Sequence, residues 1–379
     1  MKLLIEQGAL QKALARVLGI VGTRTTIPIL ENVAIDAREG QIWLTATDLV
    51  MEARARVDGR IEEEGEITAS AALLGDLVRS APSGAEVSLS HGADDPRLIL
   101  KFGRSRYQVP VLPRVDFPVL PPLERPVVVT VQAVDLKGMI GRVAFAQSND
   151  VRARAYLCGV HLHVAPKAPD GPAPLRMVAT NGFRLALADV PMVGAPVEFP
   201  DVILPAKAVA EFSRALEGRA GEIKLAIAAS AVILELEDAA LRTKVIDGNP
   251  VDYMRVVPQT WAQQAVVDRQ VLVNTARRIA LVSDNKDRTI KVTFDGDLMK
   301  LQARSTESAQ GSEELEIQYD GPPFEVAWNA GYLIDAISQT DADNVAFSLT
   351  DAGGPARVEP AANDPEHGPV LSILMPQRA

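Results

Sequence analysis

His161 and His163 come nearest, by type and spacing, to a reactive site in this chain. They stand two residues apart in an alternating segment, so both imidazoles would point to the same side of a strand. Two imidazoles on one face supply half of a tetrahedral zinc site. Neither a cysteine pair nor a set of carboxylates stands beside them in sequence. The pattern therefore favours solvated strand histidines and predicts no metal site, and an enzyme centred on this pair remains the alternative.

Other catalytic signatures are missing from the sequence. It contains no GxxxxGK[ST], no GxGxxG after a strand and no GxSxG, which removes the usual signals of nucleotide binding and of a serine nucleophile. Asp48, in the segment TATDL, is an acid in a suggestive place. Similar segments elsewhere carry Asn181 and Ser305 at the comparable positions, which favours turn capping over acid catalysis. We therefore predict no catalytic residue and no cofactor.

Basic residues on predicted helices and turns form a second group with chemical potential. Such side chains bind a phosphate backbone without reading its bases, and an aromatic content of only 4% disfavours base stacking. The net charge of −10 opposes a conventional DNA-binding protein, but basic helices inside a ring with an acidic rim would resolve the conflict. The group comprises Lys12, Arg16, Arg24, Arg79, Lys137, Arg142, Arg152, Lys207, Arg214, Arg277, Arg278, Lys286 and Arg288.

These residues must be positioned by a domain that the sequence repeats three times. A helix-like block followed by a strand-like block begins at Ser70, Pro205 and Asn329, with similar flanking blocks in the same order. Copies about 125 to 135 residues apart are too long for a solenoid, since each can fold alone. Leu77, Phe212 and Ile337 take the same helical phase. The repeat predicts an α+β chain of three domains, 1–122, 123–258 and 259–379.

Within the first copy, hydrophobic periodicity predicts two helices and several strands. The helices are expected over 8–19 and 71–81, the second with Ser70 as its N-cap. The strands of the first copy are expected over 2–7, 31–36, 41–46, 50–57, 85–90, 97–102 and 105–111.

The third copy contains a segment without such periodicity. Residues 352–368 are rich in Gly, Pro, Asp and Asn, and this composition predicts a mobile loop.

Composition restricts the compartment. The 379 residues are 47% hydrophobic and 23% charged, an ordinary globular mixture, and no stretch approaches 18 consecutive apolar residues. The first ten residues lack the apolar run of a signal peptide. A single cysteine, Cys158, fits a reducing cytoplasm and is expected to be a buried apolar residue on a strand. We predict a cytoplasmic protein without a membrane segment.

Several short motifs, in order and over essentially the whole chain, resemble the bacterial DNA polymerase III β subunit, the sliding clamp family. The motifs are RTTIPILENV (24–33), LTATDLVME (44–52), GRSRYQV (103–109), LPRVDFPVL (112–120), YLCG (156–159), ATNGFRLA (179–186), VIDG and DYMRVVP (245–258), LTD (349–351) and LMPQRA (374–379).

This resemblance implies that each copy is a two-helix, two-sheet domain and that two chains join head to tail into a six-domain ring around duplex DNA. Such a protein is a processivity factor and not an enzyme. The implied dimer interface comprises Arg104, Arg106, Tyr107, Leu281, Val282, Glu313 and Glu314, with Glu307 a further acid facing the arginines. The implied DNA-facing residues are Arg24, Arg79, Asn149, Arg152, Lys207 and Arg288, with Arg154 competing with Arg152 for one place.

The resemblance also implies a pocket between copies two and three that receives a short apolar peptide from the DNA polymerase III α subunit, the clamp loader complex, and other polymerases and repair proteins. Met suits such a pocket because it adapts to varied ligands, and arginine can bond a peptide carboxylate. Phe183 and the segment GNPVDY depart from the family pattern, which leaves the place of Val251 open. The pocket residues are Leu157, Thr180, Gly182, Phe183, Arg184, Leu185, Arg255, Val256, Ile373, Met375, Pro376, Gln377 and Arg378.

One further alternative remains at this stage. A monomeric hub could bind peptides through the same cleft and never touch DNA. The clamp hypothesis predicts a homodimer that DNA retains by topology, whereas the hub predicts neither.

Overall fold

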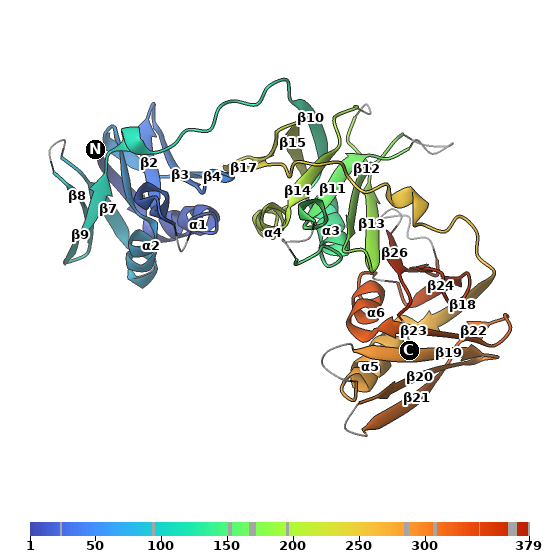
Figure 1. Cartoon of the computed structure of the whole chain (residues 1–379). Coiled ribbons are helices and arrows are strands. Elements are labelled where there is room, and N and C mark those ends of the chain that lie inside the picture. The colour runs from blue at the N-terminus through green and yellow to red at the C-terminus, as the bar shows by residue number, and fades with distance from the viewer. Residues whose placement is uncertain are drawn as a thin grey trace. The chain divides into compact units, whose positions relative to one another are not determined.

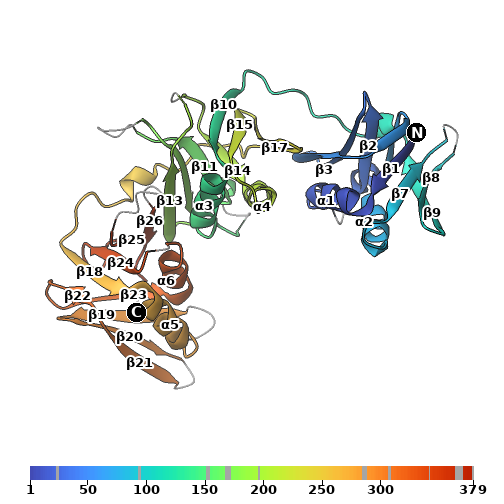
Figure 2. The same ribbon diagram turned by 180° about the vertical axis from the view of Figure 1, so that it is seen from behind.

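The computed structural model describes residues 1–22, 25–92, 95–150, 154–166, 172–194, 197–283, 288–305, 309–340, 342–362 and 370–377. Contacts divide the chain into two compact units, which Figures 1 and 2 draw from opposite sides. The first unit holds Met1–Thr130, Ala210–Ala215 and Glu222–Val245. The second holds Val131–Val209, Leu216–Gly221 and Ile246–Ala379.

The first unit contains two adjacent helices and one long antiparallel sheet. Helices α1 (Gln7–Leu18) and α2 (Ala71–Ser80) contact each other, as Figures 1 and 2 both show. The sheet has the order β10-β15-β16-β17-β4-β3-β2-β6-β9-β8-β7-β1-β5. Its strands are β1 (Lys2–Glu6), β2 (Asn32–Arg38), β3 (Gln41–Thr47), β4 (Met51–Val57), β5 (Arg60–Glu63), β6 (Gly65–Ser70), β7 (Glu86–Ser90), β8 (Arg97–Phe102), β9 (Ser105–Leu112), β10 (Val127–Gln132), β15 (Glu222–Ala228), β16 (Ala231–Leu236) and β17 (Ala239–Lys244).

The second unit contains two antiparallel sheets. The larger has the order β14-β11-β12-β13-β26-β25-β24-β18-β22 and the smaller β21-β20-β19-β23. Helix α3 (Ala133–Ala144) packs on β13, and α5 (Arg269–Ala280) packs on α6 (Ala330–Ile337); α4 (Ala206–Ala215) begins in this unit and ends in the first. The strands are β11 (Gly159–Val164), β12 (Leu175–Thr180), β13 (Arg184–Val190), β14 (Val202–Pro205), β18 (Gln263–Asp268), β19 (Thr289–Asp295), β20 (Leu298–Arg304), β21 (Gln310–Glu316), β22 (Gln318–Tyr319), β23 (Phe324–Asn329), β24 (Asn344–Leu349), β25 (Ala356–Pro360) and β26 (Val370–Leu374).

Hydrophobic patterning explains these elements. In β4, Met51, Ala53, Ala55 and Val57 are buried, while the residues between them are more exposed, which is the period of two that a strand requires. Helix α1 buries one face, and the Glu6 carboxylate caps it by accepting a hydrogen bond from the backbone N–H of Ala9 at 2.8 Å. The predicted helices and strands of the first copy match the observed ones to within two residues.

The same strand pairing joins one repeat to the next at two places. Strand β17 of the second repeat pairs with β4 of the first, and β26 of the third repeat pairs with β13 of the second. By chain order, β9 is the counterpart of β17 and β26, and β21 is the counterpart of β4 and β13. Among the described residues, β21 pairs only with β20, and residues 105–110 of β9 pair only with β8. In the described residues, β9 of the first repeat and β21 of the third repeat therefore each leave one edge without a neighbouring strand.

The turn that precedes each of these joining strands confirms the capping role predicted for Asp48. Its carboxylate accepts hydrogen bonds from the backbone N–H groups of Val50 and Met51. Asn181 accepts from Phe183 and Arg184 in the same way. Ser305 closes the third turn, with its hydroxyl accepting from the Ala309 N–H at 3.2 Å. The polar residue at this position organises a turn.

Four details differ from the sequence predictions. Ser70 precedes α2 but makes no side-chain capping bond, because it is the last residue of β6. Leu77 is half-buried, and Val78 takes the core position instead. The loop expected over 352–368 contains strand β25, while 363–369 lie outside the described residues. Cys158 is buried as predicted, but it lies just before β11 rather than on a strand.

In the described part of the chain, no helix combines the length and the apolar character that crossing a membrane requires.

Glu52, on β4, offers a test of the first unit. Burial raises the pKa of its carboxyl group, against the opposing effects of Arg242, Arg54 and Arg114. The folded state therefore binds the proton more tightly than the unfolded state, and this stabilisation is present at low pH and lost as pH rises through the folded pKa. We expect Glu52→Gln to raise Tm at pH 7 by roughly one to three degrees.

Calorimetry at pH 7 and at pH 4 would check this expectation. The difference between the variant and the unchanged chain should shrink at pH 4, where both side chains are neutral. Arg242 keeps a partner in the variant because its guanidinium also donates to the Pro121 carbonyl. A lower Tm for the variant at pH 7 would show that the attraction between the Glu52 carboxylate and the neighbouring arginines outweighs the cost of burying that carboxylate.

Candidate functional site

An apolar cleft of about 170 Å³ opens where β13 and β26 pair. The end of β12 supplies Thr180, the turn after it supplies Gly182, and β26 with its C-terminal extension supplies Ile373 and Met375. The backbone N–H of Met375 donates to the Phe183 carbonyl at 2.9 Å, which extends the β13–β26 pairing and fixes this wall. The cleft is lined by Arg154, Tyr156, Leu157, Thr180, Gly182, Arg184, Leu185, Val251, Val256, Ile373 and Met375.

The floor of the cleft belongs to a small buried cluster. Leu185 and Ile373 are 3% and 1% exposed, and they pack with Val178, Tyr253 and Val257. A floor held this firmly keeps its shape when a ligand arrives. Met375, at the rim, is less buried and can adapt to different apolar side chains. The cleft is therefore suited to one or two apolar side chains of a peptide.

Arg184 lines the cleft but already has partners. Its guanidinium donates to the Asp335 carboxylate at 2.5 Å and to the Phe145 carbonyl, and it stacks over the Tyr332 ring at 4.4 Å. The side chain is only 12% exposed. These contacts tie β13 to α6, so Arg184 fixes one wall of the cleft. A bond from Arg184 to a bound peptide remains a prediction.

The structure brings eight of the thirteen predicted pocket residues together around this cleft: Leu157, Thr180, Gly182, Arg184, Leu185, Val256, Ile373 and Met375. Phe183 is 62% exposed beside it. The Arg255 side chain is 86% exposed and pairs with Asp252 at 3.0 Å. Pro376 and Gln377 follow Met375 outside the lining, and the Gln377 backbone N–H donates to Ala327. Arg378 lies outside the described residues.

Sequence reasoning missed two lining residues and left a third open. Tyr156 and Arg154 come from the segment RARAYLCG, where Arg154 was expected to compete for a DNA contact. Val251 lines the cleft although GNPVDY departs from the family pattern. Sequence position could have indicated these residues. The segment RARAYLCG includes the motif YLCG, and GNPVDY overlaps the motif DYMRVVP. Residues close in sequence to pocket residues tend to lie close to the pocket in space.

The predicted DNA-facing residues are on the surface wherever the structure describes them. Arg79, Asn149, Lys207 and Arg288 are all exposed. Arg79 lies in the last turn of α2 and pairs with Asp76 at 2.8 Å. Arg24 and Arg152, like Lys286 of the wider basic group, fall outside the described residues. Within the wider group, Arg16 is already neutralised by Asp238 at 2.6 Å.

The predicted interface residues lie at the two open strand edges and at the end of α5. Arg104 and Arg106 are exposed, and the Tyr107 ring stacks on Phe102 at 5.4 Å. Leu281, just beyond α5, is 85% exposed. Val282, beside it, packs against the core of the third repeat.

The two acids of β21 already hold partners in one chain. Glu313 pairs with Arg278 at 2.5 Å, which lowers the pKa of Glu313 and raises that of Arg278. Glu314 pairs with Lys300 at 2.9 Å. Glu307, the third acid expected here, lies outside the described residues.

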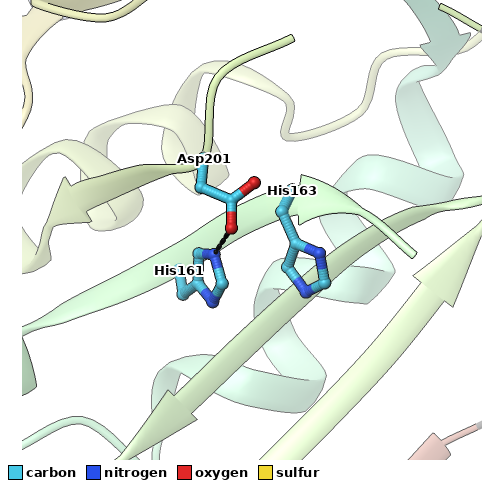
Figure 3. Close-up of side chains that lie close together, drawn as sticks. All are labelled: His161, His163 and Asp201. Carbon is cyan, nitrogen blue, oxygen red and sulfur yellow. Dashed lines mark hydrogen bonds and ion pairs between the residues drawn. The ribbon is translucent and has the colours of Figure 1, made fainter. Parts of the chain in front are cut away.

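The histidine pair differs from the prediction of solvated side chains. His163 is 7% exposed, and only 12% of the His161 side chain is exposed. A carboxylate does accompany them in space although none stands beside them in sequence, because Asp201, just before β14, lies 3.0 Å from the Nε2 atom of His161 (Figure 3). Sequence inspection missed Asp201 because it is 40 residues away and arrives only through the β11–β14 pairing.

Three α+β repeats joined edge to edge by antiparallel strands, with an apolar cleft at the second joint, define a DNA clamp. Models of the N-terminal, central and C-terminal domains of the DNA polymerase III β subunit match residues 1–121, 130–251 and 254–374. The chain therefore belongs to the DNA polymerase III β subunit family, the β sliding clamps, which are non-catalytic processivity factors.

Individual relatives match along their full length. The β sliding clamp of Caulobacter vibrioides is 39% identical over 378 residues, covering 100% of both chains. The crystal structure of the C. crescentus β sliding clamp matches with a TM-score of 0.94 at 40% identity, covering 100% of this chain and 99% of that one. The Pseudomonas aeruginosa clamp bound to griselimycin matches with a TM-score of 0.92 at 31% identity, covering 100% of both chains.

Proposed function

We propose that two copies of this chain close into a ring around duplex DNA and tether the replicative polymerase to it. The observation that carries the proposal is the full-length similarity to β sliding clamps in all three domains. We place the domain limits at 1–122, 123–258 and 259–379 and the protein in the cytoplasm. Such a ring holds DNA by topology, so it does not depend on a positive net charge.

Ring closure follows from the strand pairing within one chain. Strand pairs β4–β17 and β13–β26 each join two consecutive repeats. Applied once more, the same rule pairs β21 of one copy with β9 of the other, in a head-to-tail contact that two copies can close. It would also cover the open strand edges, which are otherwise sites of uncontrolled association.

Charge and apolar surface at these edges support the same contact. Arg104 and Arg106 are exposed at the β9 edge, whereas Glu313 and Glu314 lie on β21. Opposite charges facing each other across two edges favour that pairing and fix its register. Leu281 adds a large exposed apolar side chain that contact with another copy would bury.

We further propose that the cleft between β13 and β26 receives a short apolar peptide from the DNA polymerase III α subunit, the clamp loader complex, and other polymerases and repair proteins. The apolar floor, the adaptable methionine and the small volume support this role. The Pseudomonas aeruginosa relative, crystallised with griselimycin, supports the view that clamps of this family bind small ligands.

A loading experiment tests the proposal. Labelled protein would be loaded by a clamp loader and ATP onto nicked circular DNA, separated from free protein at high salt, and the DNA then cut once. Retention on the circle and release after the cut are expected. Equal binding before and after the cut would instead indicate contact affinity, and a relative known to load, run in parallel, makes a failure to load interpretable.

The basic surface is expected to contribute little to retention. Replacing Arg79 and Lys207 together with alanine should leave retention on closed circles unchanged, because the link is topological. It should weaken direct binding of unloaded protein and reduce the slope of log K against log salt by about 2. Fluorescence anisotropy across a salt series measures this slope.

A matched control replaces two exposed strand lysines, Lys224 and Lys244, which are not predicted to face DNA. This control should retain the slope of the unchanged chain. If both double variants lower the slope equally, the assignment of Arg79 and Lys207 to the DNA-facing surface is wrong.

A further inference from the structure

His161, His163 and Asp201 form a compact cluster outside the partner cleft. The two histidines lie on the same face of β11, and their rings stack with centroids 4.3 Å apart. Strand β14 pairs with β11 so that His161 is opposite Ile203, which brings Asp201 beside the histidines from the neighbouring strand. Each residue offers a ligand atom within 4.8 Å of the others. Figure 3 shows the carboxylate of Asp201 reaching His161, with the ring of His163 alongside.

Hydrogen bonds hold His163 in the form that metals require. Its Nδ1 atom lies 2.9 Å from the Val164 carbonyl, so Nδ1 carries the proton and donates it. The Nε2 atom is then unprotonated and accepts a hydrogen bond from the Tyr253 hydroxyl at 3.2 Å, so an ion bound at Nε2 would take the place of that hydrogen bond. A ring N–H held by a backbone carbonyl is the usual support of a metal-binding histidine, since it fixes the ring and its tautomer.

His161 provides a second observation that points to a ligand. Its Nε2 atom bonds Asp201 at 3.0 Å, whereas its Nδ1 atom is buried and has no hydrogen-bond partner among the described residues. A buried ring nitrogen without a partner is costly. The cluster combines two imidazoles and one carboxylate, a set of donors that favours a cation.

We propose that His161, His163 and Asp201 bind a divalent transition-metal ion, with Zn²⁺ the ion that the ligand set fits best. Two imidazoles and one carboxylate are typical zinc ligands, and hard cations such as Mg²⁺ prefer all-oxygen sites. The ion would fasten β11 to β14 at the edge of the larger sheet.

The distances suit this ion. Zinc bonds of about 2.0 to 2.2 Å in a tetrahedron place neighbouring ligand atoms roughly 3.3 to 3.6 Å apart. The cluster spans at most 4.8 Å, so modest side-chain rotations close it. Asp201, whose side chain is 56% exposed, has room to make this movement.

The fourth position of the ion would face an open cleft. A cleft of about 1460 Å³ adjoins the cluster and is lined by all three residues together with Tyr253 and Asp252. A water molecule, or a side chain of a bound molecule, can therefore complete the coordination. Three protein ligands with one open position resemble an exchangeable site more than a closed structural one.

The full-length protein, treated with a chelator and then dialysed, would be titrated with Zn²⁺ by calorimetry and with Co²⁺ by visible absorption. We expect one ion per chain, a dissociation constant in the micromolar range or tighter, and the intense visible bands of tetrahedral Co²⁺. Asp201→Asn should weaken Zn²⁺ binding at least about tenfold, and because Asp201 is exposed this variant should fold. His163→Gln should remove binding.

Asp252→Asn is the matched control, because Asp252 is an exposed carboxylate in the same cleft outside the cluster. This variant should bind Zn²⁺ as the unchanged chain does. His91→Gln controls for a histidine elsewhere in the chain. No binding by the unchanged chain, or equal loss of binding in Asp201→Asn and Asp252→Asn, would overturn the proposal.

Discussion

Replacing Leu281 with aspartate is expected to separate the proposed dimer into single chains. Leu281 is 85% exposed in the single chain, beside core-packed Val282, and the proposed contact with a second copy would bury it. In the proposed ring the aspartate carboxylate would be buried without a partner. The dimer dissociation constant should rise at least a hundredfold, which corresponds to about 2.8 kcal/mol. Sedimentation equilibrium over a concentration series measures this change.

Val271→Asp is the control for a new negative charge on the same helix. Val271 lies in the first turn of α5 and is 48% exposed, far along the helix from Leu281. We expect this variant to remain dimeric. Both variants should keep the thermal stability of the single chain, because neither side chain belongs to the core. A Leu281→Asp protein that still sediments as a dimer would place the interface elsewhere.

Local patterns in the sequence were sufficient to predict most elements of the first copy, because alternation in β4 and the apolar face of α1 directly reflect burial. Strand β5 was missed because its residues RIEE are charged and largely exposed. Strand β6 was missed because it continues directly into α2. Serine is a residue type typical of helix N-caps, but Ser70 is the last residue of the strand.

Pairing between distant segments was beyond the reach of local patterns. Asp201 joins His161 only because β14 pairs with β11, and no local signal reports that pairing. Strand β25 was hidden in the same way, within a segment whose composition predicts a loop. Its short run, Ala356–Pro360, becomes a strand because it lies between β24 and β26. Contacts with neighbouring strands determine whether a segment with low intrinsic strand propensity forms a strand.

The pocket residues came from the resemblance and not from periodicity. Leu185 and Ile373 are equally typical of an ordinary core, and they are almost completely buried. Their cleft exists because β13 pairs with β26, which places residue 184 opposite residue 374. These two residues are separated in sequence by most of the second and third repeats. The family motifs carry that long-range information, whereas composition and spacing do not.

Met375→Glu is expected to abolish partner binding through the proposed pocket. A carboxylate at this rim would place a charge in a cleft lined by Leu185, Val256 and Ile373, and a bound apolar peptide would strip water from that charge at a large cost in free energy. Arg184, which also lines the cleft, already pairs with Asp335. The affinity for a fluorescent clamp-binding peptide of the DNA polymerase III α subunit should fall at least a hundredfold, or about 2.8 kcal/mol. Fluorescence anisotropy measures this loss.

Met254→Glu separates this effect from a general effect of added charge. Met254 is 45% exposed on the short helix Tyr253–Arg255 and lines the neighbouring cleft instead of the pocket. Peptide affinity should survive in this variant. Because the clamp loader is proposed to use the same pocket, Met375→Glu should also fail to load onto circular DNA while remaining a dimer in sedimentation. Normal peptide affinity in Met375→Glu would move the partner site away from the β13–β26 joint, and loss of the dimer would show that the substitution acts on the fold and not on the pocket.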